Sequence, residues 1–309
     1  MRKNPVFIVI VTAAILGVLF FGVVFLASFL SGGKRTGENL PIVGAGRVAL
    51  VKVEGVLLTS KFIVEELNDY ADDPSIKAII IRIDSPGGGV VVSQEIYNAV
   101  LNAKKEGKKI VVSMGTVAAS GGYYIAAAAD KIVANPGTLT GSIGVIMQFT
   151  VIEKLLDKIG VKGQVIKAGE YKDMGSPFRD MTPQEKKLLQ NVIDDVHNQF
   201  IEAVVKGRNG ALAEGRKLSP EEVRAIADGR IFTGRQAFDL RLVDELGDLN
   251  DSIRIAGALV GIKGKPQVIE KKKKIPFLEY LKDETATWIA DVLTHSINRS
   301  TVTLQYLYR

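Results

Sequence analysis

The chain contains no cysteine and only two histidines among its 309 residues. The absence of cysteine excludes a thiol nucleophile, a disulfide bond and a zinc–thiolate site. His197 lies in a long helical pattern and His295 in the C-terminal tail. A lone histidine on a helix is usually a surface or boundary residue, so a Ser-His-Asp triad has little support. The remaining general base for a serine nucleophile is a lysine kept neutral by burial, and we expect neither a metal ion nor another cofactor.

Residues 6–30 contain no charged side chain. A run of about 20 apolar residues is enough to cross a bilayer as a helix. A secretory signal peptide has a shorter apolar core and a cleavage site of small residues, whereas the nearest candidate site here begins with the bulky Phe25. We therefore expect a retained transmembrane anchor over residues 6–31, preceded by a cytoplasmic segment over residues 1–5.

The charges that flank this run give only a slight orientation bias. Arg2 and Lys3 precede it and Lys34 and Arg35 follow it, which weakly favours an inside N-terminus and an extracytoplasmic body. The net charge is +6, and the run of lysines at 271–274 supplies much of the excess. No aromatic side chains alternate with the basic ones, so we expect a solvated or lipid-facing surface and no nucleic acid partner.

Short apolar segments alternate with segments of helical period from Gly46 onward. The expected strands cover residues 48–53, 78–83, 110–113, 131–134, 145–147 and 164–167. The expected helices cover residues 62–70, 91–105, 152–159 and 183–206. This alternation predicts an α/β fold of repeated βα units with a largely parallel sheet. We expect a polar linker over residues 32–45 and one large domain over residues 46–262.

Two helix starts are marked by capping boxes. Thr182 followed by a proline and Glu185 predicts the first, and the segment that begins at Ser219 repeats the arrangement. Gly207 and Gly210 are expected to end the first of these helices. Residues 263–309 predict a basic hinge followed by an amphipathic C-terminal tail.

Two glycine-flanked segments, residues 84–89 and 118–124, each follow an apolar run and lead toward a helix. Such a junction leaves backbone N–H groups unpaired, and these groups can hold an oxyanion. Ser120 lies in the second segment and is the candidate nucleophile.

The same junctions predict the donors of an oxyanion hole. The N–H of Gly121 is the natural first donor because it directly follows Ser120. Gly87 or Gly88 could supply the second donor, because their loop ends a neighbouring strand. Spacing alone does not select one lysine among the many in this chain as the base.

Five blocks together carry a specific resemblance. They read DSPGG at 84–88, AASGGYY at 118–124, LTGSIGV at 139–145, EYKDMGSP at 170–177 and DGRIFTGRQA at 228–237. In this order they resemble signal peptide peptidase A in its short bacterial form, over roughly residues 46 to 256. The resemblance implies a crotonase-like, Clp protease-related fold and a serine protease anchored in the bacterial cytoplasmic membrane by one span. It further implies hydrolysis of remnant signal peptides and other short apolar peptides.

The resemblance also implies the roles of individual residues. By position, Ser120 is the nucleophile that forms an acyl-enzyme, Lys172 is the general base and Ser142 orients the lysine amine. It implies an octameric ring in which Ser120 of one subunit meets Lys172 of its neighbour. In this family the C-terminal tail can occupy the active sites, and the segment 304–308 could serve as such a peptide.

Lys172 can act as a base only if its amine is neutral. An exposed ammonium keeps its proton at neutral pH, whereas burial favours the neutral amine. A carboxylate beside the amine would favour the charged form, so we expect Lys172 to be buried and Asp173 to point away from it.

Two other functions remain open at this point. The first is a crotonase-type acyl-CoA enzyme, which pairs oxyanion N–H groups without a nucleophilic serine; the glycine blocks offer it no clear acidic base. The second is a non-catalytic membrane scaffold that has kept the fold. A membrane anchor fits the acyl-CoA enzyme badly, and the presence of both Ser120 and Lys172 argues against the scaffold.

Overall fold

The computed structural model describes residues 47–271 and the backbone of residues 305–307. These residues fall within the compact unit Gly46–Arg309. The anchor expected at residues 6–31 and the amphipathic stretch of the tail before residue 305 lie outside the described residues. Within the described part of the chain, none of the helices has both the length and the hydropathy that a bilayer crossing needs.

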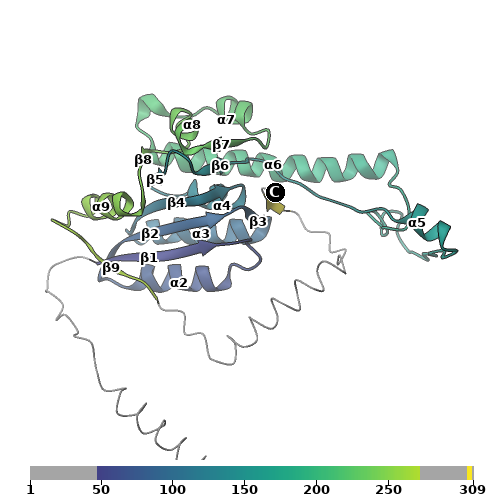
Figure 1. The fold of residues 1–309 in the computed structure, drawn as a ribbon, viewed down its shortest axis with the longest axis horizontal. Coiled ribbons are helices and arrows are strands. Elements are labelled where there is room, and N and C mark those ends of the chain that lie inside the picture. The colour runs from purple at the N-terminus through teal and green to yellow at the C-terminus, as the bar shows by residue number, and fades with distance from the viewer. Residues whose placement is uncertain (1–46, 272–304, 308–309) are drawn as a thin grey trace, which may run out of the picture. The chain divides into compact units, whose positions relative to one another are not determined.

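A mostly parallel β-sheet lies at the centre of the fold (Figure 1). Its strands are β1 (Arg47–Glu54), β2 (Ile76–Ser85), β4 (Lys109–Ala119), β5 (Lys131–Ala134), β6 (Leu139–Gly141), β7 (Ile231–Thr233), β8 (Glu245–Leu246) and β9 (Gln267–Ile269). The main path runs β7-β6-β4-β2-β1-β9, with β5 placed between β4 and β8, and only β6 and β7 pair in antiparallel fashion. The predicted α/β architecture with a parallel sheet is confirmed.

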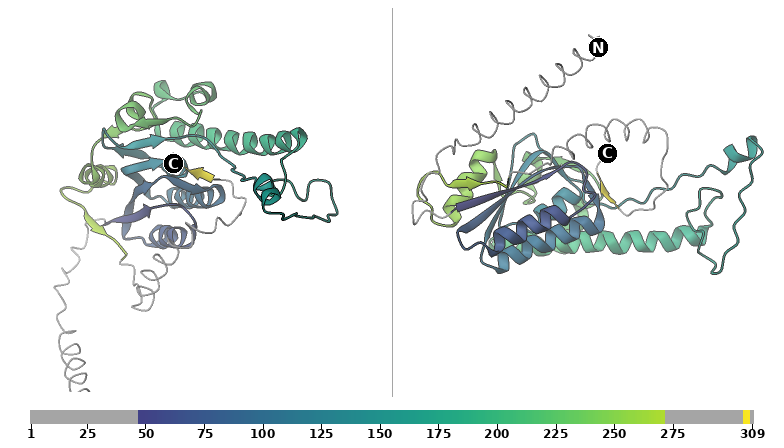
Figure 2. Two further views of the ribbon diagram at one scale, coloured as in Figure 1. Left: turned by 45° about the vertical axis from the view of Figure 1, so that its right-hand side comes forward. Right: turned by 90° about the horizontal axis from the view of Figure 1, so that it is seen from below.

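Successive residues of a strand point to opposite faces of the sheet, and in the central strands both sets are apolar. Both faces of the sheet are therefore buried. Val51 and Val53 of β1 belong to the larger core cluster, and Val48 and Leu50 belong to a second cluster on the other face. The helices α2 (Lys61–Asp72) and α3 (Val90–Lys105) lie side by side over the larger cluster (Figure 2). The helix α9 (Leu249–Leu259) covers the smaller one.

The long helix α6 (Pro183–Ala211) begins at the predicted capping box, in which Thr182 and Glu185 cap each other. The prediction that Gly207 or Gly210 ends it is wrong. Gly207 lies within the helix, and an ideal Cβ there would lie 2.1 Å from the carbonyl oxygen of Ala127. Glycine at this position therefore lets α6 pack closely against the backbone of Ala127. The capping box at Ser219 also opens a helix, α7 (Pro220–Ile226). The remaining helices are α4 (Gly121–Ala126), α5 (Glu153–Lys158), α8 (Gly234–Asp239) and the 3-10 turn η1 (Glu214–Arg216).

We call residues 145–182 the arm. It carries α5 and extends beyond the sheet together with the first half of α6 (Figure 1). The strands expected at residues 145–147 and 164–167 are absent from it. Ile146 forms only an isolated β-bridge, and Val165 and Ile166 are exposed in irregular backbone. Strand propensity without a pairing partner does not make a strand.

A short strand, β3 (Gly87–Gly89), lies off the main sheet. It bonds on one edge to Leu57 and pairs on the other with β10 (Gln305–Leu307), which runs antiparallel to it. β3 therefore joins the start of α3 to a segment from the far end of the chain.

Candidate active site

Ser120 forms a sharp turn between the last residue of β4 and the first residue of α4. Its backbone adopts φ 54° and ψ −117°, which is uncommon for a residue with a Cβ and costs on the order of 1–3 kcal/mol. Its N–H donates to the carbonyl of Gly141 on β6 at 2.8 Å, and its carbonyl accepts from the N–H of Tyr124 at 2.8 Å. The neighbouring strand and helix thus hold the turn on both sides.

The hydroxyl of Ser120 is buried without a partner. Ser120 is only 1% exposed, and its Oγ makes no hydrogen bond within the described residues. A buried hydroxyl normally finds a partner, because leaving it unpaired costs about 1–3 kcal/mol. A buried hydroxyl without a partner is therefore unusual, and a catalytic role is one explanation for it.

The backbone of β3 brings a second N–H group toward Ser120. The N–H of Leu57 donates to Gly87 O at 2.8 Å, and the N–H of Gly89 donates to Leu57 O at 2.9 Å. Because successive residues of a strand direct their N–H groups to opposite edges, Gly88 presents its N–H to the edge where β10 pairs. The N–H of Gly87 instead donates to Ser85 Oγ at 3.1 Å. Of the two expected second donors, Gly88 is the one whose N–H points to the edge that β10 occupies, whereas the N–H of Gly87 is already bonded to Ser85.

The two glycine segments touch, as the sequence predicted for neighbouring strand ends. An ideal Cβ on Gly121 would lie 3.2 Å from Gly87 Cα and 3.3 Å from Gly88 N. On Gly88 it would lie 2.3 Å from Leu57 O. Only residues without a side chain fit at this contact, so the structure brings Ser120, Gly121 and Gly88 together in one place.

Two buried serines support this arrangement and were given no role from the sequence. Ser85 Oγ donates to Gly55 O at 2.6 Å while accepting from Gly87, and Ser93 Oγ donates to Gly89 O at 3.0 Å. Both serines have no exposed surface. Their signal in the sequence is a small polar residue at a position that the helix or strand period predicts to be buried.

Ser142 lies near the Ser120 turn. It also has a positive φ, of 51°, and its N–H donates to the carbonyl of Arg230 at 2.8 Å. It directly follows Gly141, whose carbonyl holds Ser120, so it belongs to the same layer of backbone contacts. Within the described residues it makes no contact with the amine of Lys172.

Lys172 lies on the arm, in a turn between α5 and α6. Its N–H donates to Gly169 O at 3.3 Å, while its side chain is exposed and its amine forms no hydrogen bond or ion pair within the described residues. The expectation that Lys172 is buried is therefore not met inside one chain. The structure does not bring Lys172 to Ser120, because no described group reaches the Ser120 hydroxyl.

Asp173 points away from the Lys172 amine, as expected. Its carboxylate accepts two hydrogen bonds from Arg179, both at 2.8 Å, and an ion pair from Lys167. The Arg179 guanidinium, followed by Lys167, holds the pKa of Asp173 well below its usual range. Arg179 and the N–H of Thr182 likewise lower the pKa of Glu185 to about 2.

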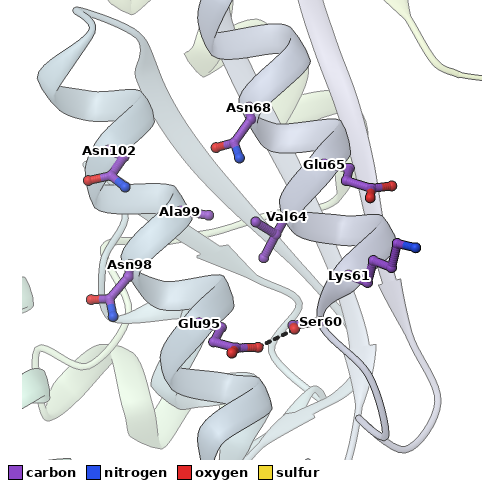
Figure 3. Close-up of a pocket in the computed structure, with 9 residues that line it drawn as sticks. All are labelled: Ser60, Lys61, Val64, Glu65, Asn68, Glu95, Asn98, Ala99 and Asn102. Carbon is purple, nitrogen blue, oxygen red and sulfur yellow. Dashed lines mark hydrogen bonds between the residues drawn. The ribbon is translucent and has the colours of Figure 1, made fainter.

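The other groups considered from the sequence lie apart from this place. His197 is on α6, and its buried Nε2 makes no hydrogen bond within the described residues. A polar cavity of about 440 Å³ lies between α2 and α3, where Asn68, Asn98 and Glu95 line it (Figure 3). Neither Ser120 nor Lys172 contributes to its wall. Among residues 47–271, no cluster of His, Asp and Glu has the arrangement of a metal site.

Comparison with known proteins agrees with this geometry. Residues 102–263 match the model of peptidase family S49, and residues 58–138 match that of Clp protease. The chain is 44% identical over 218 residues to a Synechocystis protein provisionally named as a protease, covering 70% of this chain and 75% of that one. It is 34% identical over 259 residues to a similarly named protein of Methanocaldococcus jannaschii, covering 79% and 80%. An Enterococcus faecium protein provisionally named signal peptide peptidase SppA is 34% identical over 232 residues, covering 73% and 61%.

A parallel α/β sheet with a strained, buried serine beside two glycine segments, together with the family matches, defines a serine peptidase of the Clp-related kind. The chain belongs to peptidase family S49. The resemblance drawn from the five sequence blocks is confirmed.

Proposed function

We propose that this peptidase is a membrane-anchored endopeptidase that cleaves remnant signal peptides and other short apolar peptides, with Ser120 as nucleophile and Lys172 as general base. The single observation that carries the proposal is the buried Ser120 hydroxyl, which has no hydrogen-bond partner among the described residues and lies on a strained turn where Gly121 meets Gly88. The provisional name of the Enterococcus relative supports this class of substrate.

The residues account for each proton in the reaction. The Lys172 amine takes the proton of Ser120 as Oγ attacks the scissile carbonyl, and the N–H groups of Gly121 and Gly88 bind the resulting oxyanion. Lys172 then gives the proton to the leaving amine, which leaves an ester on Ser120. A water molecule attacks that ester and gives its proton to the same lysine, and the ester oxygen of Ser120 recovers a proton as the acid departs.

The lysine in this scheme comes from a neighbouring subunit of an octameric ring. Support comes from the exposed Lys172 on the arm and from a Ser120 hydroxyl that no described group of its own chain reaches. The arm also carries exposed apolar side chains that one chain leaves uncovered, among them Leu155, Ile159 and Val161. Such surfaces are typical of subunit contacts. Contact with a neighbour would bury Lys172 and favour its neutral form.

The substrate binds as an added strand on β3. Support comes from β10, a segment of the chain's own tail that pairs antiparallel with β3, with Tyr306 opposite Gly88. Main-chain pairing of this kind accepts many sequences, and side-chain contacts supply the preference. Two strongly exposed apolar residues lie close to β3 in sequence: Leu58 follows Leu57, which bonds to β3, and Val91 lies in the first turn of α3, which follows β3. They suit the aliphatic residues of a signal peptide, and the tail occupies the same edge until a substrate displaces it.

The anchor proposed over residues 6–31 places the catalytic domain, residues 46–262, on the extracytoplasmic side of the bacterial cytoplasmic membrane. Ser142 orients the incoming lysine amine. Support for Ser142 is its position next to Gly141, which holds the Ser120 turn.

Labelling of the full-length protein in detergent micelles tests the proposal. A fluorophosphonate probe should label Ser120, as located by peptide mass spectrometry, and both Ser120→Ala and Lys172→Ala should lose labelling and peptide turnover. His197→Ala is the matched control and should keep both. Full turnover by Lys172→Ala would refute the base assignment. Turnover of acyl-CoA without labelling would favour the crotonase-type alternative, and a correctly folded protein without either activity would favour the scaffold.

A further inference from the structure

The side chain of Arg179 joins two carboxylates that lie in different parts of the chain. Its Nε and Nη2 donate to the two oxygens of Asp173, both at 2.8 Å. Its Nη1 and Nη2 donate to the two oxygens of Glu185, at 2.9 and 2.5 Å. One guanidinium therefore makes a two-pronged contact on each side, a geometry that lysine cannot reproduce.

Glu185 is fixed independently of Arg179. Its carboxylate accepts the N–H of Thr182 at 2.8 Å in the capping box of α6, and its side chain is only 4% exposed. The far end of α6 is anchored in the body of the domain, where Gly207 packs against Ala127. Asp173 is thus attached, through Arg179, to a helix whose own position is set by the core.

Lys172 lies between two attached neighbours. On one side Asp173 is held by Arg179, and on the other the hydroxyl of Tyr171 accepts from Gln184 Nε2 at 2.7 Å. Gln184 is in the first turn of α6, like Glu185. The residues before and after Lys172 are therefore both tied to one helix end, while the Lys172 amine itself makes no described contact.

An ordinary surface ion pair would not behave in this way. Exposed pairs contribute little and hold no fixed geometry. Here the Asp173 side chain is 11% exposed, and the Arg179 contacts also occupy the one carboxylate adjacent to Lys172 in sequence. The contact with Arg179 therefore fixes the backbone next to Lys172 and keeps the Asp173 carboxylate away from its amine.

We propose that Arg179 is a positioning residue, which holds the turn at residues 171–173 against α6 and so fixes where Lys172 presents its amine to the serine of the neighbouring subunit. This inference rests on the proposed function. A displacement of about 1 Å in a reacting group can cost about 10²-fold in rate.

Kinetics of full-length Arg179→Gln in detergent micelles provide the first test. We expect kcat to fall by about 10²-fold with KM within about threefold, because the substrate edge at β3 is unaffected. Arg179→Lys, which keeps the charge and loses the fork, should recover only part of the rate. Arg254→Gln removes an exposed arginine that pairs with Asp251 on α9, and it should keep the wild-type rate. Wild-type kcat in Arg179→Gln would overturn the inference.

Mixed rings separate positioning from folding. In rings assembled from both variants, the Lys172→Ala chain supplies the intact serine (the serine donor) and the Ser120→Ala chain supplies the intact lysine (the lysine donor). Every active pair therefore combines one chain of each kind. Arg179→Gln added to the lysine donor, the Ser120→Ala chain, should lower their activity by the same factor of about 10², whereas the same change in the serine donor should leave it unchanged. Equal loss from either chain would overturn the inference in favour of a structural role.

The wild-type and Lys172→Ala proteins keep the two proposals distinguishable. If Lys172→Ala retains turnover, the proposed function fails whatever Arg179 does. If Lys172→Ala is inactive and Arg179→Gln is fully active, only the positioning role fails. Should Arg179→Gln not fold, Arg179→Lys in the same mixed rings gives the same contrast between the two donors.

Discussion

Gly88 N lies 3.3 Å from the point where a Cβ on Gly121 would stand, so the middle of β3 and the first residue of α4 are in direct backbone contact. This contact brings Gly88 of one βα unit beside Gly121 of the next, the residue that directly follows Ser120. It depends on the absence of side chains at both positions, because a Cβ on Gly88 would also lie 2.3 Å from Leu57 O. The arrangement is therefore sensitive to one added methyl group.

Gly88→Ala should lower kcat by about 10²–10³-fold, the loss typical of an oxyanion donor. The methyl group forces β3 away from Leu57 and moves the Gly88 N–H. Steady-state kinetics on a fluorogenic peptide measure the effect. Gly137→Ala is the control, because its Cβ would meet no atom within 4 Å, and it should keep the wild-type rate. A fully active Gly88→Ala would exclude Gly88 as a donor.

Arg208→Ala should destabilise the domain by about 3–5 kcal/mol, the usual cost of removing one partner of a buried ion pair. Among the described residues, the buried Asp244 would keep only the N–H of Ile132 and a 3.9 Å ion pair with Lys131. Arg208 is fully buried on α6, and its Nη2 lies 2.9 Å from Asp244 Oδ1, although without the alignment of a hydrogen bond. Its Nε donates to the carbonyl of Arg241 at 3.2 Å. Urea unfolding followed by circular dichroism measures the change. A loss below about 1 kcal/mol would show that the pair is not needed to dock α6.

Acid should loosen the first turn of α6 before it unfolds the core. Arg179 lowers the pKa of Asp173 and Glu185, to about 2 for Glu185, so their stabilising contribution is complete above the pKa of the unfolded carboxylates. It is lost as the pH falls from about 5 toward 2. Hydrogen exchange at residues 185–188, corrected for intrinsic rates, should show protection at pH 6 that declines toward pH 2. Arg179→Gln should lack that decline, and equal protection at both pH values in the wild type would contradict the assignment.

The sequence predicted the central elements well where local pattern and burial agree. The β-branched runs of β1 and β2 and the capping boxes of α6 and α7 all appear in the structure. β4 continues to Ala119, beyond the four residues expected, because pairing with β6 extends it across Gly115. β3 was not expected as a strand, since its three glycines have low strand propensity and only the pairing with Leu57 reveals it.

The candidate site divides in the same way. Ser120 and the glycines could be located from the strand–glycine–helix pattern, because that pattern is local. Lys172 came only from family resemblance, since nothing in its spacing distinguishes it from other lysines. Its exposure in the single chain could not be foreseen from sequence, because the proposed burial by a second subunit would leave no local signal.

Activity of mixed rings tests the shared Ser120–Lys172 pair most directly. Ser120→Ala and Lys172→Ala proteins, each inactive alone, are unfolded, mixed in equal amounts and refolded together in detergent. Random assembly pairs an intact serine with an intact lysine at about one contact in four, so the mixture should recover about a quarter of the wild-type rate. No recovery, from mixed rings shown to be assembled, would contradict a catalytic pair drawn from two subunits.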